Sequence, residues 1–360
     1  MNRIIFGGAF DPVHNGHINM ALNAQKALSG EVIFVPARIS VWKKDSAPIE
    51  DKIAMLELAI KPYSGFSIEK YEIENGKETT YSIDTIKYLK EKYPNDNLYL
   101  LIGTDQVNAF HKWKSADEIA DLVTIVHFSR PGYEIDQENV KRFKMVQIKG
   151  EECNISSTEI RKLQRIDLPD DVLFYIVEHD LYEGMVELKR ILSPHRLNHS
   201  KSVAKLSYRI AKANHLDKPL RYFLAGLLHD IGKDIPLEKQ YSLTKESFPK
   251  YADMPKFSYH QFAGSVLAKE MFKIEDADIL NAIKYHSTGS DDMDLMGKII
   301  YAADKIEPTR GFDSTDLINA MLEDADKGFK TVLQANKDFL DEQGKMTDNP
   351  LTSKCFNKYL

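Results

Sequence analysis

The hydrophobic pattern of this 360-residue chain changes near its midpoint, and this change limits the fold more than any other feature. In the first half, short strand-like runs alternate with helix-like segments. From about Leu188 onward, the strand signals disappear and long helical patterns follow one another. Because 360 residues exceed the usual span of one hydrophobic core, we expect two domains, residues 1–184 and residues 185–360.

The alternation in the first half predicts an α/β, Rossmann-like domain with a parallel sheet. Strand-like runs are expected at residues 4–6, 32–35, 66–73, 98–102 and 122–128, with helices between them and a closing helix at 169–182. The second half is expected to be all-α. Its helical patterns cover residues 195–214, 218–231, 258–272, 277–285, 295–306 and 314–339.

Composition excludes several classes of protein. No apolar run approaches the roughly 20 residues that a membrane-spanning helix needs, and the first residues lack a signal-peptide pattern, so we expect a cytoplasmic protein. Two distant cysteines indicate neither a disulfide framework nor a thiolate zinc site. The 22 basic and 29 acidic residues up to Glu183, and 26 and 25 after it, lack the positive excess of a nucleic-acid binder.

Residues 4–22, IIFGGAFDPVHNGHINMAL, contain a strand-like run, two glycines, a short loop and a helix start. Gly7 and Gly8 let backbone N–H groups approach an anion closely, and a helix N-terminus favours negative charge. His14 and His17 stand three positions apart at the helix start, so both imidazoles can face one bound group. The segment predicts a phosphate-binding site that does not use a P-loop.

This segment resembles the TxFDPxHxGH-type stretch of the nucleotidyltransferase superfamily, with Ala9 where that family usually carries Thr or Ser. A second superfamily element is ISSTEIR, a run of hydroxyls at a helix start that is also an ordinary helix cap. Together the two elements imply a grip on ATP. The implied ATP contacts are Gly7, Gly8, Ala9, Phe10, His14, His17, Ser156, Ser157, Thr158 and Arg161.

Three further segments, TTYSIDTI, GTDQVNAFHKW and FSRPG, resemble the nicotinate-nucleotide adenylyltransferase family, and the resemblance covers essentially all of residues 1–183. An indole is suited to stacking on a flat, electron-poor ring, although packing in the core is the alternative for Trp113. Asp105 is expected just past a strand, at the carboxyl edge where open α/β sheets bind ligands. The implied nicotinate nucleotide site is Thr80, Tyr81, Ser82, Asp105, Trp113 and Arg130.

The resemblance implies that ATP and nicotinate mononucleotide react to give nicotinic acid adenine dinucleotide and pyrophosphate. The attacking 5′-phosphate is already anionic, so catalysis is expected to rely on positioning and charge stabilisation, with Mg²⁺ accompanying the departing pyrophosphate. A family lysine that contacts phosphate matches Lys43 or Lys44, and Lys52 replaces an expected Arg. The implied catalytic residues are His14, His17, Lys44 and Arg161.

Histidine and aspartate recur along the helical half. Six of the eleven histidines lie there, four of them within or beside helical patterns, and the pair His229–Asp230 follows an apolar helix. Imidazole and carboxylate ligands without thiolate suit iron, manganese or a similar first-row metal. For any single histidine, a solvated surface position is the alternative.

The order of these residues matches the HD superfamily. Four segments, RLNHSKSVA, LAGLLHDIGK, KYHSTG and IIYAADKIEPTR, resemble more closely the bacterial HD-domain family that cleaves diadenosine tetraphosphate to two ADP, over about residues 188–339. The resemblance implies two transition-metal ions, iron or manganese, with Asp230 also catalytic. The implied metal ligands are His199, His229, Asp230, His260, His286 and Asp304. Lys233 and Arg310 are phosphate contacts or solvated charges.

Two alternatives stay open for the second half. It is a hydrolase of another nucleotide, or it is a sensor that binds a nucleotide without turnover and regulates the first half. For the first half, the alternative is another small-molecule nucleotidyltransferase, because the superfamily acts on several substrates.

Overall fold

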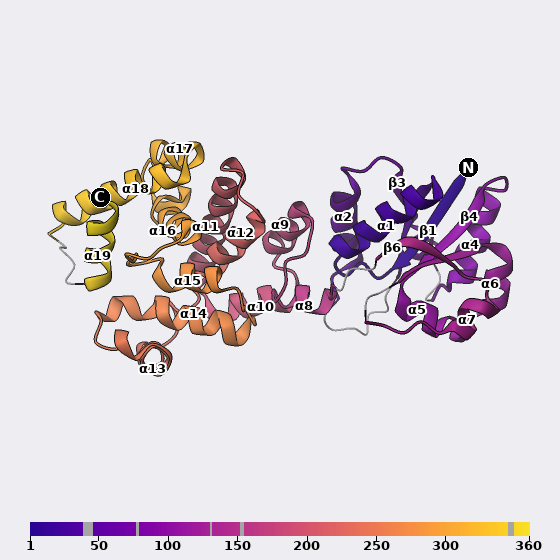
Figure 1. Ribbon diagram of the computed structural model, residues 1–360, viewed down its shortest axis with the longest axis horizontal. Helices are drawn as coiled ribbons and strands as arrows, with labels where there is room; N and C mark the ends of the chain where they lie inside the picture. Colours follow the sequence, from indigo (N-terminus) through magenta and orange to yellow (C-terminus); the bar gives the residue numbers. More distant parts are fainter. Residues whose placement is uncertain (39–45, 77–78, 130–131, 152–154, 345–348) are drawn as a thin grey trace. The chain divides into compact units, whose positions relative to one another are not determined.

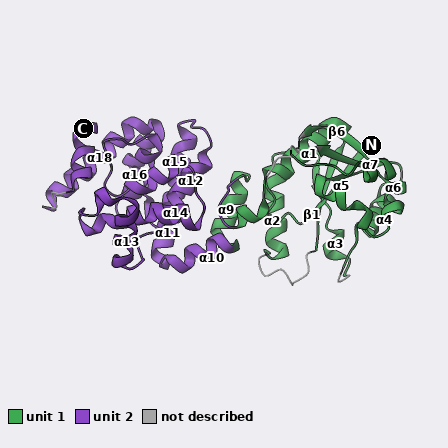
Figure 2. Ribbon diagram, turned by 60° about the horizontal axis from the view of Figure 1, so that its bottom comes forward, with its two compact units in different colours: residues 1–161, 167–182 green, residues 162–166, 183–360 purple. Residues whose placement is uncertain are grey.

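The computed structural model describes residues 1–38, 46–76, 79–129, 132–151, 155–344 and 349–360 (Figure 1). The chain divides into two compact units (Figure 2). Unit 1 comprises Met1–Arg161 and Asp167–Tyr182, and unit 2 comprises Lys162–Ile166 and Glu183–Leu360. The expected join at residue 184 lies inside helix α10 (Tyr182–Ile191).

Unit 1 is built on a six-stranded sheet in which each neighbouring pair is parallel, as predicted. The strands are β1 (Asn2–Gly8), β2 (Glu31–Pro36), β3 (Phe66–Ile68), β4 (Asn97–Ile102), β5 (Thr124–Ser129) and β6 (Val146–Glu151). Their spatial order is β3-β2-β1-β4-β5-β6. The strand predicted at 66–73 ends at Ile68, and β6 was not predicted.

The helices of unit 1 follow the strands. They are α1 (Asn15–Leu28), α2 (Ile49–Ile60), α3 (Tyr71–Glu74), α4 (Ser82–Lys92), α5 (Thr104–Ala109), the 3₁₀ turn η1 (Phe110–Lys112), α6 (Ala116–Leu122), α7 (Gln137–Arg142), α8 (Ser157–Arg161) and α9 (Asp170–Glu178). Strand residues alternate between two cores. Ile5, Leu100 and Ile125 pack with residues of α4 and α6, whereas the rings of Phe6 and Phe34 contact each other on the other face.

The strand order places a topological switch point between β1 and β4. The chain leaves β1 toward β2 on one side and returns to β4 on the other, and Phe6 pairs with both Phe34 and Leu101. In open α/β sheets, ligands bind in the crevice outside the carboxyl ends of the strands at such a point. Gly7 and Gly8, at the end of β1, lie at this edge.

The described residues of unit 2 form helices and 3₁₀ turns, as the all-α prediction requires. They are α10, α11 (Pro194–Ala213), α12 (Pro219–Leu228), α13 (Leu237–Ser247), η2 (Pro249–Tyr251), η3 (Lys256–Ser258), α14 (Tyr259–Met271), α15 (Ala277–Tyr285), α16 (Leu295–Ile306), η4 (Pro308–Arg310), α17 (Thr315–Glu323), α18 (Ala325–Glu342) and α19 (Pro350–Tyr359). The single helix predicted at 314–339 is wrong: Asp324 ends α17 and caps α18, accepting the N–H groups of Asp326 and Lys327.

Within the described ranges, each helix is too short or too polar to cross a membrane.

Candidate active sites

His14 and His17 cap helix α1 together. The His17 N–H donates to Nδ1 of His14 at 3.4 Å, and the His14 N–H donates to Nδ1 of His17 at 3.2 Å. The rings stack with centroids 3.6 Å apart. Since Nδ1 accepts in both rings, the proton of each neutral imidazole is on Nε2. Burial, and then the electrostatic influence of the neighbouring His14 ring, lower the pKa of His17 well below its usual value, so His17 is a neutral Nε2–H donor.

The glycines of this loop make room for specific side chains. A Cβ on Gly8 would lie 2.9 Å from the Phe10 ring, and one on Gly16 would lie 3.0 Å from Nδ1 of His14. A Cβ on Gly7 would meet no atom within 4 Å, because Gly7 borders open space. Phe10 is buried and its ring contacts His17 at 5.1 Å between centroids, so this predicted ATP contact supplies core packing with its side chain.

Arg161 connects helix α8 to the histidine loop. Its Nη1 donates to the backbone oxygen of Asp11 at 2.8 Å, and its Nη2 donates to Oγ1 of Thr158 at 3.2 Å. Ser156 accepts the Glu159 N–H at 3.4 Å, as an ordinary helix cap does. The fold therefore brings the two sequence motifs, 150 residues apart, into direct contact.

A cavity of about 220 Å³ opens at the switch point. Its walls come from the ends of β1, β2 and β4 and from α3, α4 and α5. Among the predicted residues, Gly7, Gly8, Ala9, Ser82 and Trp113 line it. Three lining residues with polar side chains escaped the sequence analysis, namely Glu72, Thr85 and Gln106. The sequence signal for Glu72 was weak because it lies in a segment predicted as a strand.

Three predicted pyridine-site residues lie outside the lining of this cavity. Thr80 accepts a hydrogen bond from Asn75 at 2.8 Å, Tyr81 is 43% exposed, and Asp105 is exposed on α5. Arg130, Lys43 and Lys44 lie outside the described residues. Lys52, at the position of the expected Arg, is buried in α2, and burial lowers its pKa.

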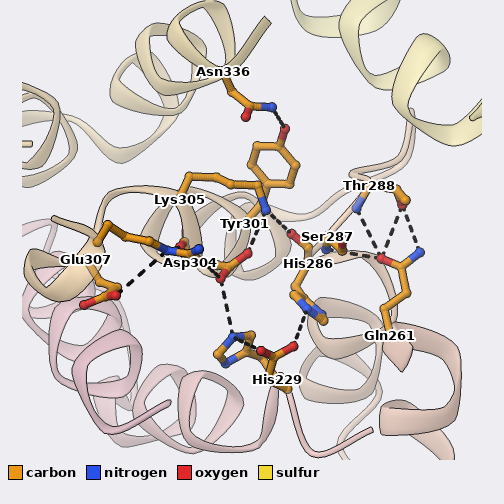
Figure 3. A network of polar contacts seen from close by, with 12 residues as sticks. His229, Gln261, His286, Ser287, Thr288, Tyr301, Asp304, Lys305, Glu307 and Asn336 are labelled. Atoms are coloured by element: carbon orange, nitrogen blue, oxygen red, sulfur yellow. Dashed lines mark hydrogen bonds and ion pairs between the residues drawn. The ribbon is translucent and has the colours of Figure 1, made fainter. Parts of the chain in front are cut away.

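Unit 2 brings all six predicted metal ligands together in a buried cluster, with the side chains of His229, His286 and Asp304 converging in Figure 3. Nε2 of His199 lies 3.0 Å, and Nε2 of His229 3.6 Å, from Oδ1 of Asp304. Nε2 atoms of His260 and His286 lie 3.5 and 3.3 Å from Oδ1 of Asp230. Asp230 thus belongs to two groups of potential ligands, one with His199 and His229 and one with His260 and His286.

The orientation of three rings is set by their own helices. His229, His260 and His286 each place Nδ1 2.7 Å from the backbone oxygen three residues earlier, in Gly226, Phe257 and Ile283. Donation from Nδ1–H directs the Nε2 lone pair into the cluster, as metal-binding histidines require. Among the residues that the structure describes, none forms a hydrogen bond with the buried Nε2 of His229. This donor set fits divalent metal ions of the first transition row.

His199 is oriented by a carboxylate that the sequence analysis missed. Its Nδ1 lies 2.9 Å from Oε1 of Glu307, a buried residue that follows α16. Burial opposes ionisation of Glu307, but hydrogen bonds from His199, Ser202 and Thr309 outweigh it and hold its pKa at about 2. A carboxylate behind a ligating histidine raises the basicity of the ring.

Cationic side chains surround the two aspartates. Arg196 donates to Asp230 at 3.0 Å, Lys305 donates to Asp304 at 2.7 Å, and Arg310 also bonds Asp304. Lys233 lies 3.3 Å from Nε2 of His260. The predicted phosphate contacts Lys233 and Arg310 therefore lie at the cluster, with Arg196 and Lys305 as additional cations that suit a polyphosphate.

Comparison with known proteins divides the chain in the same way. A cytidylyltransferase-like family model matches residues 5–163, and an HD domain model matches residues 196–309.

Two relatives span both halves, and a third matches less than half of the chain. A probable nicotinate-nucleotide adenylyltransferase/Ap4A hydrolase of Mycoplasma genitalium is 33% identical over 311 residues, which cover 85% of this chain and 87% of the relative. Its counterpart in Mycoplasma pneumoniae is 30% identical over 342 residues, 92% of this chain and 98% of the relative. A probable nicotinate-nucleotide adenylyltransferase of Aquifex aeolicus is 42% identical over 168 residues, 44% of this chain and 99% of the relative.

Proposed function

This chain belongs to the family of the nicotinate-nucleotide adenylyltransferase/Ap4A hydrolases, and we propose that it catalyses two reactions, one in each unit. In unit 1, ATP and nicotinate mononucleotide give nicotinic acid adenine dinucleotide and pyrophosphate. In unit 2, water cleaves diadenosine tetraphosphate to two ADP. The observation that carries the proposal is that one chain holds both the reciprocal histidine pair and the buried six-ligand cluster.

In the first reaction, an oxygen of the 5′-phosphate of nicotinate mononucleotide attacks the α-phosphorus of ATP, and the bond to pyrophosphate breaks. The nucleophile needs no base. Negative charge develops on the α-phosphate oxygens, so the required groups are donors held in place before the reaction. The Nε2–H groups of His14 and His17 and the guanidinium of Arg161 fill this role, because their other contacts fix them to the loop.

The remaining unit 1 groups position the substrates. The hydroxyls of Ser156, Ser157 and Thr158 bind ATP phosphates, and Mg²⁺ bound with ATP would supply neutralisation of the pyrophosphate charge. The cavity at the switch point receives the pyridine ring, with Trp113 and Ser82 in its wall. Two further roles are proposed from the sequence resemblance: Lys44 contacts phosphate, and Arg130 belongs to the nicotinate nucleotide site.

In unit 2, the proposed centre contains two iron or manganese ions. Bound metal ions supply activation of a water molecule and neutralisation of charge on phosphate. Asp230 would connect the ligand group of His199 and His229 with that of His260 and His286, because it belongs to both. Lys233 and Arg310 bind the polyphosphate chain at the edge of the cluster. Cleavage to two ADP rests on the sequence resemblance of unit 2 and on the names of the relatives.

One experiment tests both assignments. The purified chain is incubated with ATP, Mg²⁺ and nicotinate mononucleotide, and separately with Mn²⁺ or Fe²⁺ and a panel of dinucleoside polyphosphates, nucleoside monophosphates and guanosine alarmones. Formation of the dinucleotide and preferred release of ADP support the proposal. Preferred hydrolysis of another nucleotide favours the first alternative for unit 2, and nucleotide binding without hydrolysis favours the sensor.

A further inference from the structure

The cavity at the switch point has an unusual charge. Among its described lining residues, Glu72 carries the one ionisable carboxylate, and none carries a cationic side chain. The rest of the wall is apolar or neutral, including Phe6, Ile102, Gln106 and Trp113. The described wall of the cavity therefore contains a single negative charge and one indole ring.

Glu72 is fixed in this wall by a neighbouring helix. It lies on α3, and its Oε1 accepts a hydrogen bond from Oγ1 of Thr85 on α4 at 2.9 Å. Thr85 is itself buried. The carboxylate is thus held at a set position before any ligand binds, and it stays accessible from the cavity.

Glu72 lacks a counter-ion in the part of the chain that the structure describes. Its recorded interactions are the Thr85 hydroxyl and the like charge of Asp84, and burial is the main influence that raises its pKa. A partly buried carboxylate without a cation is unfavourable to folding and is typical of a functional site. Such a group becomes favourable when a cation enters the cavity.

The pyridine ring of nicotinate mononucleotide is such a cation, because its nitrogen is bonded to the ribose and carries a formal positive charge. Aromatic faces and carboxylates both attract cations. We propose that Glu72 is a specificity-determining residue that recognises the positive charge of the pyridinium ring in the cavity that Trp113 also lines. This inference rests on the proposed function of unit 1.

The charge of the ring and the substituent on the ring are recognised separately. Nicotinate and nicotinamide mononucleotides carry the same ring charge, so Glu72 selects a charged ring over a neutral one. It does not by itself distinguish the carboxylate substituent from the amide.

The test compares nicotinate mononucleotide with its C-nucleotide isostere, in which a neutral benzene ring that carries the same carboxylate replaces the pyridinium ring. Values of kcat/KM for both, and KM for ATP, are measured for the wild type and Glu72→Gln. The amide keeps an oxygen for Thr85 and nearly the same size. We expect the wild type to prefer the charged ring by at least ~10-fold, the scale of one nearby opposite charge. In Glu72→Gln this preference falls to near one, with an unchanged KM for ATP.

Thr85→Val is the matched control, since it removes the hydrogen bond and keeps the carboxylate. Thr85→Val is expected to lower kcat/KM for both nucleotides and to retain the preference for the charged ring. A wild type that does not discriminate, or a Glu72→Gln variant with the wild-type preference, overturns the proposal. If the wild type forms no dinucleotide at all, the proposed function fails instead. In that case, calorimetry measures the affinity of the wild type for each of the two nucleotides. Equal affinities would contradict the proposed role of Glu72.

Discussion

His14 and His17 each accept the backbone N–H of the other through Nδ1. In most helix caps, a Ser, Thr, Asp or Asn side chain accepts the orphan N–H groups. Here two imidazoles do so, and this fixes their neutral tautomer. Helix capping and the proposed phosphate binding therefore depend on the same two rings, with Nδ1 accepting the backbone N–H groups and Nε2 left to carry the proton.

Replacement of His17 separates these two contributions. His17→Ala removes both the Nδ1 acceptor that caps the helix and the Nε2–H donor. We expect its adenylyl transfer rate to fall at least ~100-fold, the scale of losing one preorganised donor. His17→Asn can restore the acceptor for the His14 N–H without the Nε2–H donor, so it regains stability more than activity. Hydrolysis by unit 2 is the internal control. Near-normal adenylyl transfer by His17→Ala would remove the histidine from the mechanism.

Acid is expected to destabilise unit 1 through the same ring. The folded-state pKa of His17 lies below its ordinary value of 6.5. As pH falls through that value, the unfolded chain binds a proton that the folded chain does not, so the stabilisation present above pH 6.5 is progressively lost. Both tryptophans precede residue 162, so tryptophan fluorescence follows the melting of unit 1. The stability of unit 1 should decline less with falling pH in His17→Asn than in the wild type. An equal decline would show that other groups cause the sensitivity to acid.

The sequence predicted the elements whose patterns are local. Helices at 277–285 and 295–306 have the bounds of α15 and α16, because a helical repeat directly reports a buried face. Strand β6 was not predicted because, at the edge of the sheet, only Val146 and Ile148 of its six residues carry apolar side chains, which is too short a pattern to indicate a strand. The division at Asp324 escaped because α17 and α18 meet without Gly or Pro.

The site residues that the sequence predicted are likewise those that belong to local patterns. The ligand histidines and aspartates were identified because they occur in short motifs, and the fold brings all six together. Glu307 and Glu72 escaped because their importance depends on tertiary neighbours, His199 for one and the cavity for the other. Each carboxylate is unremarkable in its local sequence.

Glu307→Gln is expected to weaken metal binding although Glu307 is not a predicted ligand. Loss of the carboxylate behind His199 lowers the basicity of that ring, and such changes typically reduce metal affinity or activity by about 10- to 100-fold. Metal titration followed by hydrolysis measures the effect. Thr309→Val is the control, because it removes one hydroxyl donor to Glu307 and leaves its charge. Equal metal affinity in Glu307→Gln and the wild type would contradict this role.

We propose that adenylyl transfer is separable from hydrolysis, with a cut after Leu192 rather than at residue 184. Gly184 lies in the first turn of α10, and a Cβ there would be 2.6 Å from Cγ of Leu163 and 2.9 Å from the backbone of Lys162, so the start of α10 packs closely against these two residues. The fragment 1–192 is expected to be soluble and active. The fragment 1–182 exposes Leu163 and should melt at a lower temperature. Insolubility of both fragments would indicate that unit 1 depends on the rest of unit 2.

The central claim is that the cluster around Asp230 hydrolyses diadenosine tetraphosphate while unit 1 works independently. Chromatographic analysis of the products formed from this substrate, with wild type and Asp230→Asn compared in the presence of Mn²⁺ or Fe²⁺, tests it most directly. Asparagine keeps the shape of the side chain but removes the charge shared by both ligand groups. We predict ADP as the sole product of the wild type, and no hydrolysis but normal adenylyl transfer by Asp230→Asn. Release of AMP and ATP, absence of turnover by the wild type, or ADP formation by Asp230→Asn at the wild-type rate would contradict the account.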